Sequence, residues 1–231
     1  MKKFSTGAKP VDSLLSAIVE DDRRSVGQFL EQEPKLAMRR VDTPRFYDSL
    51  IFHWIYVGDT ALHLAAAGYR VEIACVLIAV GADPNAASNH RRGAPLHYAA
   101  DGYITGPAWD AKRQVEMIAC LIDAGANINS QDKNGATPLH RAVRTHCADA
   151  VQCLLHAGCD PKLRNASGSS PFHLAVQNTG RGGSGAAEAK AAQRQIIQAF
   201  LHFGVGTALT DGKGKSVLEC ATSAPIRELL S

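Results

Sequence analysis

Short apolar segments with helical spacing alternate along this chain with polar loops rich in Gly, Asn and Asp. Thr137 and Pro138 open one such segment. Leu139, Ala142 and Val143 follow at the i, i+3 and i+4 positions of a helix face. Thr is a favoured N-cap, and Pro suits the first helical position because the N–H it lacks would have no partner there. The pattern therefore predicts a short helix from about Pro138.

A second apolar segment of the same kind follows after a few residues. Val151, Leu154 and Leu155 share the helical spacing, and Gly158 stands where a helix commonly ends. The preceding residues 127–135, NINSQDKNG, are typical of a turn-rich loop. Two helices this short cannot bury their own apolar faces, so we expect successive pairs to stack on one another.

The whole unit recurs along the chain. A Leu-His or Phe-His step is repeated at intervals of 34, 43 and 33 residues, at His63, His97, His140 and His173. An apolar segment that ends in Gly follows each of these, at Gly81, Gly125, Gly158 and Gly204. Two anchors that recur together predict an elongated solenoid.

These segments, of which ATPLHRAVR is the clearest, resemble the ankyrin repeat family, whose unit of about 33 residues carries T-P-L-H-x-A. The resemblance implies an all-α solenoid of helix-turn-helix repeats with finger loops, forming a single domain over residues 1–231. It implies about six repeats with degenerate N- and C-terminal caps, at approximately residues 12–57, 58–92, 93–134, 135–167, 168–213 and 214–231.

The recurring histidines are expected to be structural, because the resemblance implies that each one bonds its capping residue and neighbouring backbone. The six cysteines fall mostly inside apolar patterns, which is typical of small buried side chains. Cys147 and Cys159 lie at opposite ends of one expected helix, about 15 Å or more apart. We therefore expect no metal site, and nothing in the sequence calls for a cofactor.

Composition and charge add limits on function. Of 231 residues 45% are hydrophobic and 20% charged, as in a globular protein, and the net charge of +3 is too small to indicate nucleic acid or membrane binding in bulk. No apolar segment of signal-peptide type follows Lys3, and the longest apolar runs fall short of a membrane span. We expect a cytoplasmic monomer that does not contact a membrane.

Three insertions depart from the repeat pattern, at residues 44–57, 102–114 and 178–193. The first contains Phe46, Tyr47, Phe52, Trp54 and Tyr56, and two interpretations stay open: a cap over the second repeat, or an aromatic contact surface. The second contains Trp109, which either packs back or meets a partner. The third is Gly-rich and then Ala-rich, and predicts a loop followed by an extension of the next helix.

The resemblance implies a binding face built from finger loops and first helices, the concave side of the stack. It maps to Tyr56, Asp59, Arg91, Arg92, Tyr98, Asp101, Lys133, Asn134, Arg141, Arg144 and Thr145, with Ser167, Ser169, Gln177, Asn178, Lys213 and Lys215 beyond them; Trp109 joins this set from the second insertion. Basic residues outnumber acidic ones in the set, so the partner protein is expected to be acidic.

These observations favour a non-enzymatic protein-protein interaction module, either an adaptor or a stoichiometric inhibitor. No nucleophile elbow, P-loop or metalloprotease motif is present in the sequence. Two alternatives remain. One is an enzyme with a site on the aromatic insertions that uses His53, Asp48, Asp110 and Trp109. The other is nucleic-acid binding through the basic concave groove, although aromatic residues do not interleave with its basic positions.

Overall fold

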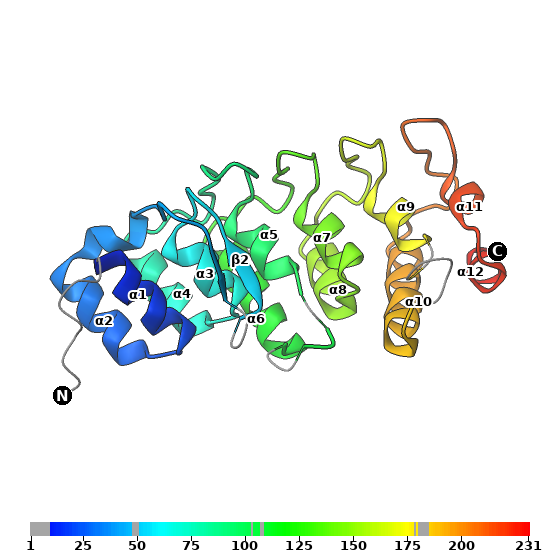
Figure 1. The fold of residues 1–231 in the computed structure, drawn as a ribbon. Coiled ribbons are helices and arrows are strands. Elements are labelled where there is room, and N and C mark those ends of the chain that lie inside the picture. The colour runs from blue at the N-terminus through cyan, green and yellow to red at the C-terminus, as the bar shows by residue number, and fades with distance from the viewer. Residues whose placement is uncertain (1–9, 48–50, 103, 107–108, 178, 180–184) are drawn as a thin grey trace.

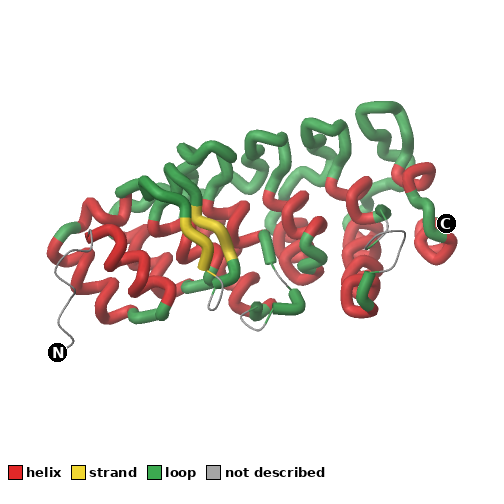
Figure 2. Tube along the Cα trace, viewed as in Figure 1, coloured by secondary structure: helices red, strands yellow, loops and turns green. Residues whose placement is uncertain are grey.

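The computed structural model describes residues 10–47, 51–102, 104–106, 109–177, 179 and 185–231. They form an elongated stack of short antiparallel helix pairs, with a row of loops projecting along one side (Figures 1 and 2). The pairs are α1 (Pro10–Val19) with α2 (Arg23–Gln32), α3 (Ala61–Ala67) with α4 (Val71–Ala79), α5 (Pro95–Ala100) with α6 (Ala111–Asp123), α7 (Pro138–Arg144) with α8 (Ala148–His156), α9 (Pro171–Ala175) with α10 (Ala187–His202), and α11 (Val217–Cys220) with α12 (Ala224–Leu230). A 3-10 helix, η1 (Pro34–Met38), follows α2.

The helices form two layers. The first helices of successive pairs contact one another from α3 to α9, and the second helices do so from α4 to α10. The apolar core runs between the layers along the stack, with side chains such as Leu62, Leu77 and Leu121 wholly buried. The expected stacking of helix pairs is thus confirmed.

The recurring histidines tie neighbouring repeats together, as expected. In the α7 unit, the backbone N–H of Thr137 donates to His140 Nδ1 at 3.1 Å, so Nε2 carries the proton and donates to the Ser169 carbonyl at 3.0 Å. His63 and His97 make the same two contacts, each with the carbonyl 3.0 Å away. His173 reaches the Lys215 carbonyl at 3.2 Å. We call these four residues the histidine ladder.

The first insertion contains an element that the all-α prediction left out. Strands β1 (Arg45–Tyr47) and β2 (His53–Ile55) pair antiparallel, with Phe46 opposite Trp54. Residues on a strand alternate between its two faces, so Ile55 is buried against the stack while Phe46 and Trp54 point away from it. The hairpin packs on α3, and β2 crosses the face of the stack near α5 (Figure 1).

The insertions at residues 102–114 and 178–193 each lead into the second helix of a pair, α6 and α10. Asp110 caps α6 by accepting from the N–H groups of Lys112 and Arg113, at 2.9 and 3.1 Å. Helix α10 is 16 residues long, which confirms the extension predicted there. Residues 180–184 of the Gly-rich loop lie outside the described residues.

The cysteines correct one expectation. Cys147 and Cys159 are buried, but Cys75 on α4 is exposed, with its Sγ 3.5 Å from Cys120 Sγ on α6. Within the described ranges, no three or more His, Cys, Asp or Glu side chains gather as a metal ion would need. No helix in that part of the chain has the length and apolar character to cross a membrane.

Candidate functional site

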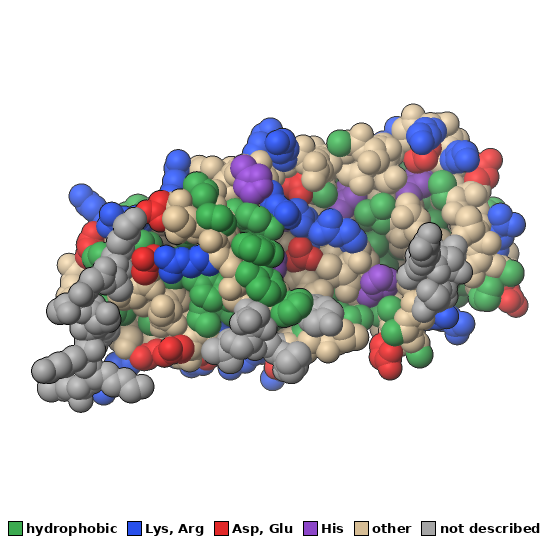
Figure 3. Space-filling model, in the orientation of Figure 1, with side chains coloured by type: hydrophobic (Ala, Val, Ile, Leu, Met, Phe, Trp, Pro, Cys, Tyr) green, Lys and Arg blue, Asp and Glu red, His purple; other side chains and the backbone are tan. Residues whose placement is uncertain are grey.

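A cleft of about 410 Å³ opens between the hairpin, the end of α3, the residues that follow α5, and α7. Its volume is within the size range of ligand sites. We call it the hairpin cleft. One side is aromatic and the other is charged, with lining side chains that include Phe46, Phe52, His53, Trp54, Tyr56, Arg91, Asp101, Arg141 and Arg144. Figure 3 shows the two sides as a hydrophobic ridge next to a group of basic side chains around a carboxylate.

The aromatic side is a row of rings in mutual contact. Phe46 lies 5.4 Å from Phe52 and 5.3 Å from Trp54, and Trp54 stacks beside Tyr56 at 6.3 Å, all between ring centroids. Phe46, Phe52 and Trp54 remain 41%, 45% and 47% exposed. Ile51 and Ile55 cover the stack, as the cap interpretation predicts, and the outer rings stay open to solvent, which a contact surface requires.

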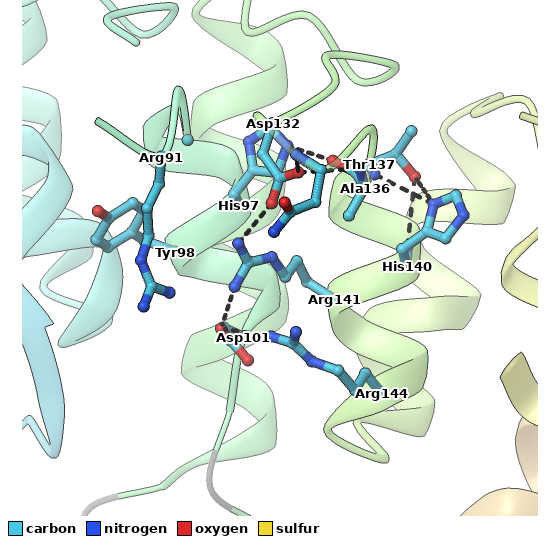
Figure 4. A network of polar contacts seen from close by, with 12 residues as sticks. Arg91, His97, Tyr98, Asp101, Asp132, Ala136, Thr137, His140, Arg141 and Arg144 are labelled. Atoms are coloured by element: carbon cyan, nitrogen blue, oxygen red, sulfur yellow. Dashed lines mark hydrogen bonds and ion pairs between the residues drawn. The ribbon is translucent and has the colours of Figure 1, made fainter. Parts of the chain in front are cut away.

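The charged side is built around Arg141, which is nearly buried (Figure 4). Its guanidinium donates to Asp132 at 2.6 Å and to Asp101 at 3.2 Å, and Arg144 lies 3.6 Å from the same Asp101 oxygen. Burial alone would raise the pKa of Asp132, but hydrogen bonds from Arg141 and from backbone N–H groups hold that pKa below its ordinary value. Arg141 is thus held in place by the buried Asp132 and the half-buried Asp101, and Arg144 contacts Asp101 alone.

Arg91 differs from Arg141 because it is exposed and stacks on an aromatic ring. Its guanidinium carbon lies 4.3 Å from the centroid of the Tyr56 ring, a cation–π contact. Among the described residues no carboxylate forms an ion pair with it. Its neighbour Arg92 is exposed at the loop tip with a positive φ of 54° and does not line the cleft.

Two residues predicted for the binding face are buried structural groups. Asp59 is 0% exposed and accepts from the Tyr98 hydroxyl at 2.8 and 3.0 Å, from Asn89 Nδ2 at 2.7 Å and from the Tyr56 N–H at 2.7 Å. Burial and the Asp59 carboxylate both raise the pKa of Tyr98. This network anchors the loop that follows the hairpin, and both side chains are closed to solvent within it rather than exposed on the predicted face.

The remaining predicted residues divide between loop tips and packed positions. Lys133 and Asn134 are exposed at the tip of the next finger loop, whereas Thr145 is half-buried and donates to the Arg141 carbonyl at 3.0 Å. Trp109 packs back: its indole N–H donates to buried Gln114 at 3.1 Å. Of the outer set, Ser167, Gln177, Lys213 and Lys215 are exposed, Ser169 is half-buried, and Asn178 lies outside the described residues.

His53 lines the cleft, although sequence reasoning considered it only for catalysis. Its Nδ1–H donates to the Trp54 carbonyl at 2.8 Å, and its Nε2 lies 4.0 Å from Asp101. Burial lowers its pKa, against the opposing effect of Asp101, so the ring is neutral near pH 7. The sequence FHWIY, from Phe52 to Tyr56, alternates with a period of two, which is typical of a strand. This alternation could have predicted that His53 faces the opposite side from Trp54.

The residues considered for catalysis are His53, Asp48, Asp110 and Trp109, and the structure describes all of them except Asp48. Asp110 caps a helix, Trp109 is packed against Gln114, and Asp48 lies outside the described residues. What the cleft offers instead is cationic and aromatic surface, which suits an anion next to an apolar group.

Comparison with known proteins points to one family. The model described as "Ankyrin repeats (many copies)" matches residues 121–175, and the model "Ankyrin repeat" matches residues 57–89 and 94–133. Rabankyrin-5 is 33% identical in Homo sapiens over 107 residues and 32% identical in Mus musculus over 105 residues, in each case 41% of this chain and 8% of the relative. Alpha-latrotoxin-Lt1a from Latrodectus tredecimguttatus is 36% identical over 88 residues, 38% of this chain and 6% of the toxin.

The family models match some residues of the hairpin cleft and not others. The chain spans less than a tenth of the length of these relatives. Arg141 and Arg144 lie inside the residues that the family models match, while the hairpin and Arg91 lie outside them. The cleft therefore joins residues inside the matched repeats to residues outside them.

Proposed function

Because the chain belongs to the ankyrin repeat family, we propose that it is a non-enzymatic module that binds a partner protein through its concave face and the aromatic hairpin. Proteins of this family generally act through protein-protein contacts. The observation that carries the proposal here is the hairpin cleft, where exposed rings and guanidinium groups stand side by side. Aromatic and Arg side chains are the types enriched at the energetic centres of protein interfaces.

The proposed contact set is narrower than the sequence implied. It keeps Tyr56, Arg91 and Arg144 in the cleft, with Arg92, Lys133 and Asn134 at the loop tips, and adds Phe46, Phe52 and Trp54 from the hairpin. It leaves out Asp59, Tyr98 and Trp109, whose polar atoms are bonded within the fold. Asp101 is bonded to Arg141 and contacts the exposed Arg144, and Thr145 donates to the Arg141 carbonyl, so these three residues are assigned a structural part.

The repeat count, the oligomeric state and the location of the protein are proposed as well. We propose six repeats in which the first and last helix pairs are caps, a monomeric state, and a cytoplasmic location. Either an adaptor or a stoichiometric inhibitor would use the same face, and the exposed guanidinium groups favour an acidic partner.

Site-specific photocrosslinking tests this function directly. Phe52, in the cleft and 45% exposed, is replaced by benzoylphenylalanine, and Phe203 on the C-terminal side of α10, 36% exposed, is replaced in a matched control. After irradiation in a lysate of the source cells, we expect a discrete protein adduct from position 52 that excess unlabelled protein suppresses. Equal adducts at both positions, or none at position 52, would contradict the proposal.

A further inference from the structure

The hairpin cleft places two kinds of contact within reach of one short ligand. Ring centroids of Trp54 and Tyr56 are 6.3 Å apart, and the Arg91 guanidinium lies 4.3 Å from the Tyr56 ring. In an extended peptide, residues i and i+2 point to the same side and lie about 7 Å apart. Two side chains of one peptide segment can therefore meet the rings and the guanidinium together.

The cations of the cleft are not equally available. Arg141 is already bonded to both Asp132 and Asp101, and only 10% of its side chain is exposed. Arg144 shares Asp101 at the longer distance of 3.6 Å, and 58% of its side chain is exposed. Arg91 is exposed as well, with a ring rather than a carboxylate as its partner. The guanidinium groups open to a ligand are thus those of Arg91 and Arg144.

The charge balance at the surface of the cleft favours an anion. Three arginines line it, and Asp101 is the one acidic residue among the described side chains of the lining. A carboxylate matches a guanidinium in geometry as well as charge. The buried carboxylates of Asp59 and Asp132 are occupied within the fold and do not reach the ligand side.

The aromatic side favours an apolar group beside that anion. Arg91 covers one face of Tyr56, whereas Phe46 and Trp54 present open ring surface. A large apolar side chain placed there would gain roughly 25 cal/mol for each Å² of apolar surface removed from water. The rings also stand on a paired hairpin, so their arrangement is set before binding.

We propose that the hairpin cleft binds an extended segment of a partner protein in which an acidic residue lies within two positions of an aromatic or large aliphatic residue. The carboxylate lies on Arg91 and Arg144, and the apolar side chain lies on Phe46 and Trp54. This inference rests on the proposed function and specifies the chemistry of the partner.

A nucleic acid shares part of this chemistry but fits less well. Binding to a phosphate backbone takes its strength from many basic contacts. Here two guanidinium groups are exposed at one cleft, and the net charge of the chain is only +3. A peptide needs a single anchor of each kind.

A peptide selection tests the inference with the intact chain. Phage displaying random 12-residue peptides are selected on the protein, and the most enriched peptide is synthesised with a fluorescein label and titrated by anisotropy. We expect enriched peptides to place Asp or Glu within two residues of Trp, Phe, Tyr, Leu or Ile. We expect Arg91→Gln with Arg144→Gln, and separately Trp54→Ala, to weaken binding at least about tenfold.

Matched control variants distinguish the loss of a specific charge or ring in the cleft from a general loss of folding. Arg144→Lys is expected to retain more affinity than Arg144→Gln, because a positive charge remains. Arg194→Gln alters an exposed Arg on α10, and Phe203→Ala removes the exposed ring of its C-cap residue. Both lie away from the cleft and are expected to change affinity by less than about twofold. Thermal melts establish that each variant is folded.

The possible results test this inference separately from the proposed function on which it rests. Enriched peptides without an acidic residue, or peptides that bind the cleft variants unchanged, overturn the inference; the photocrosslink at position 52 decides the proposed function separately. A fluorescein-labelled 20-nucleotide poly-dT that binds more tightly than the peptide, and is lost in the same variants, would overturn it in favour of a nucleic acid.

Discussion

The histidine ladder and the hairpin cleft are both polar features of the same stack, but they are built in opposite ways. In the ladder, each ring is buried and bonded on both sides, as His97 is to Ala94 and to Ala136. In the cleft, Arg91 and Trp54 remain exposed. The ladder repeats along the chain, whereas the described residues contain this hairpin once.

This difference separates stability from recognition. A buried polar group that is fully paired stabilises one packing arrangement and has no bond left for a partner. An exposed ring or guanidinium contributes little to stability and keeps its contacts available. We therefore expect changes in the ladder to alter stability strongly and changes in the outer cleft to alter binding with little effect on stability.

Acidification is expected to have the largest effect, because it acts on His63, His97 and His140 together. Burial lowers the pKa of His63 and His140, and lowers that of His97 to about 4. The unfolded chain gains these protons near pH 6.5, so stability present above that pH is lost as the pH falls toward 4. His97 alone accounts for a loss of the order of 3 kcal/mol, and the other two act in the same direction.

The measurement is urea unfolding at a series of pH values between 7 and 4. The pKa of Asp132 is lowered, so this carboxylate stays ionised over most of that range. A His97→Asn variant is expected to be less stable at pH 7 and to show a shallower dependence on pH. Stability that stays constant down to pH 4 would show that the histidines are not held neutral by the fold.

Arg141 tests the link between the two regions, because it lines the cleft and is also a buried residue of α7. Replacing it with Met leaves Asp132, whose side chain is 2% exposed, without its charged partner. We expect a loss of about 3–5 kcal/mol in the free energy of unfolding. Adding Asp132→Asn removes the unpaired charge and is expected to restore part of that loss, as measured by a double-mutant cycle in urea. Additive effects would show that the two side chains do not depend on each other.

The sequence predicted the repeated part of this molecule well, for a physical reason. In ATPLHRAVR, cap, proline and apolar spacing all favour the same short helix, and the histidine recurs in register. The insertion at 44–57 has no second copy to compare, and its alternating aromatics suit either a covering strand or an exposed one. The repeat pattern also could not predict which single residues are buried. Asp59 and Tyr98 stand at positions that the family resemblance assigns to the surface, yet the Tyr98 hydroxyl donates a hydrogen bond to the Asp59 carboxylate.

Trp54→Ala is expected to have the smallest effect on stability, and it decides between the two roles of the hairpin. The ring is 47% exposed and opposes Phe46 across the strands, a pair worth roughly 0.2–1 kcal/mol. If the outer rings are a contact surface, urea unfolding will shift by less than about 1 kcal/mol while affinity for the selected peptide falls. Phe203→Ala removes another exposed ring and should change neither quantity by much. A loss of stability above about 2 kcal/mol in Trp54→Ala would instead mean that the row of rings holds the hairpin on the stack, because removing an exposed side chain costs that much only when the structure beneath it depends on it.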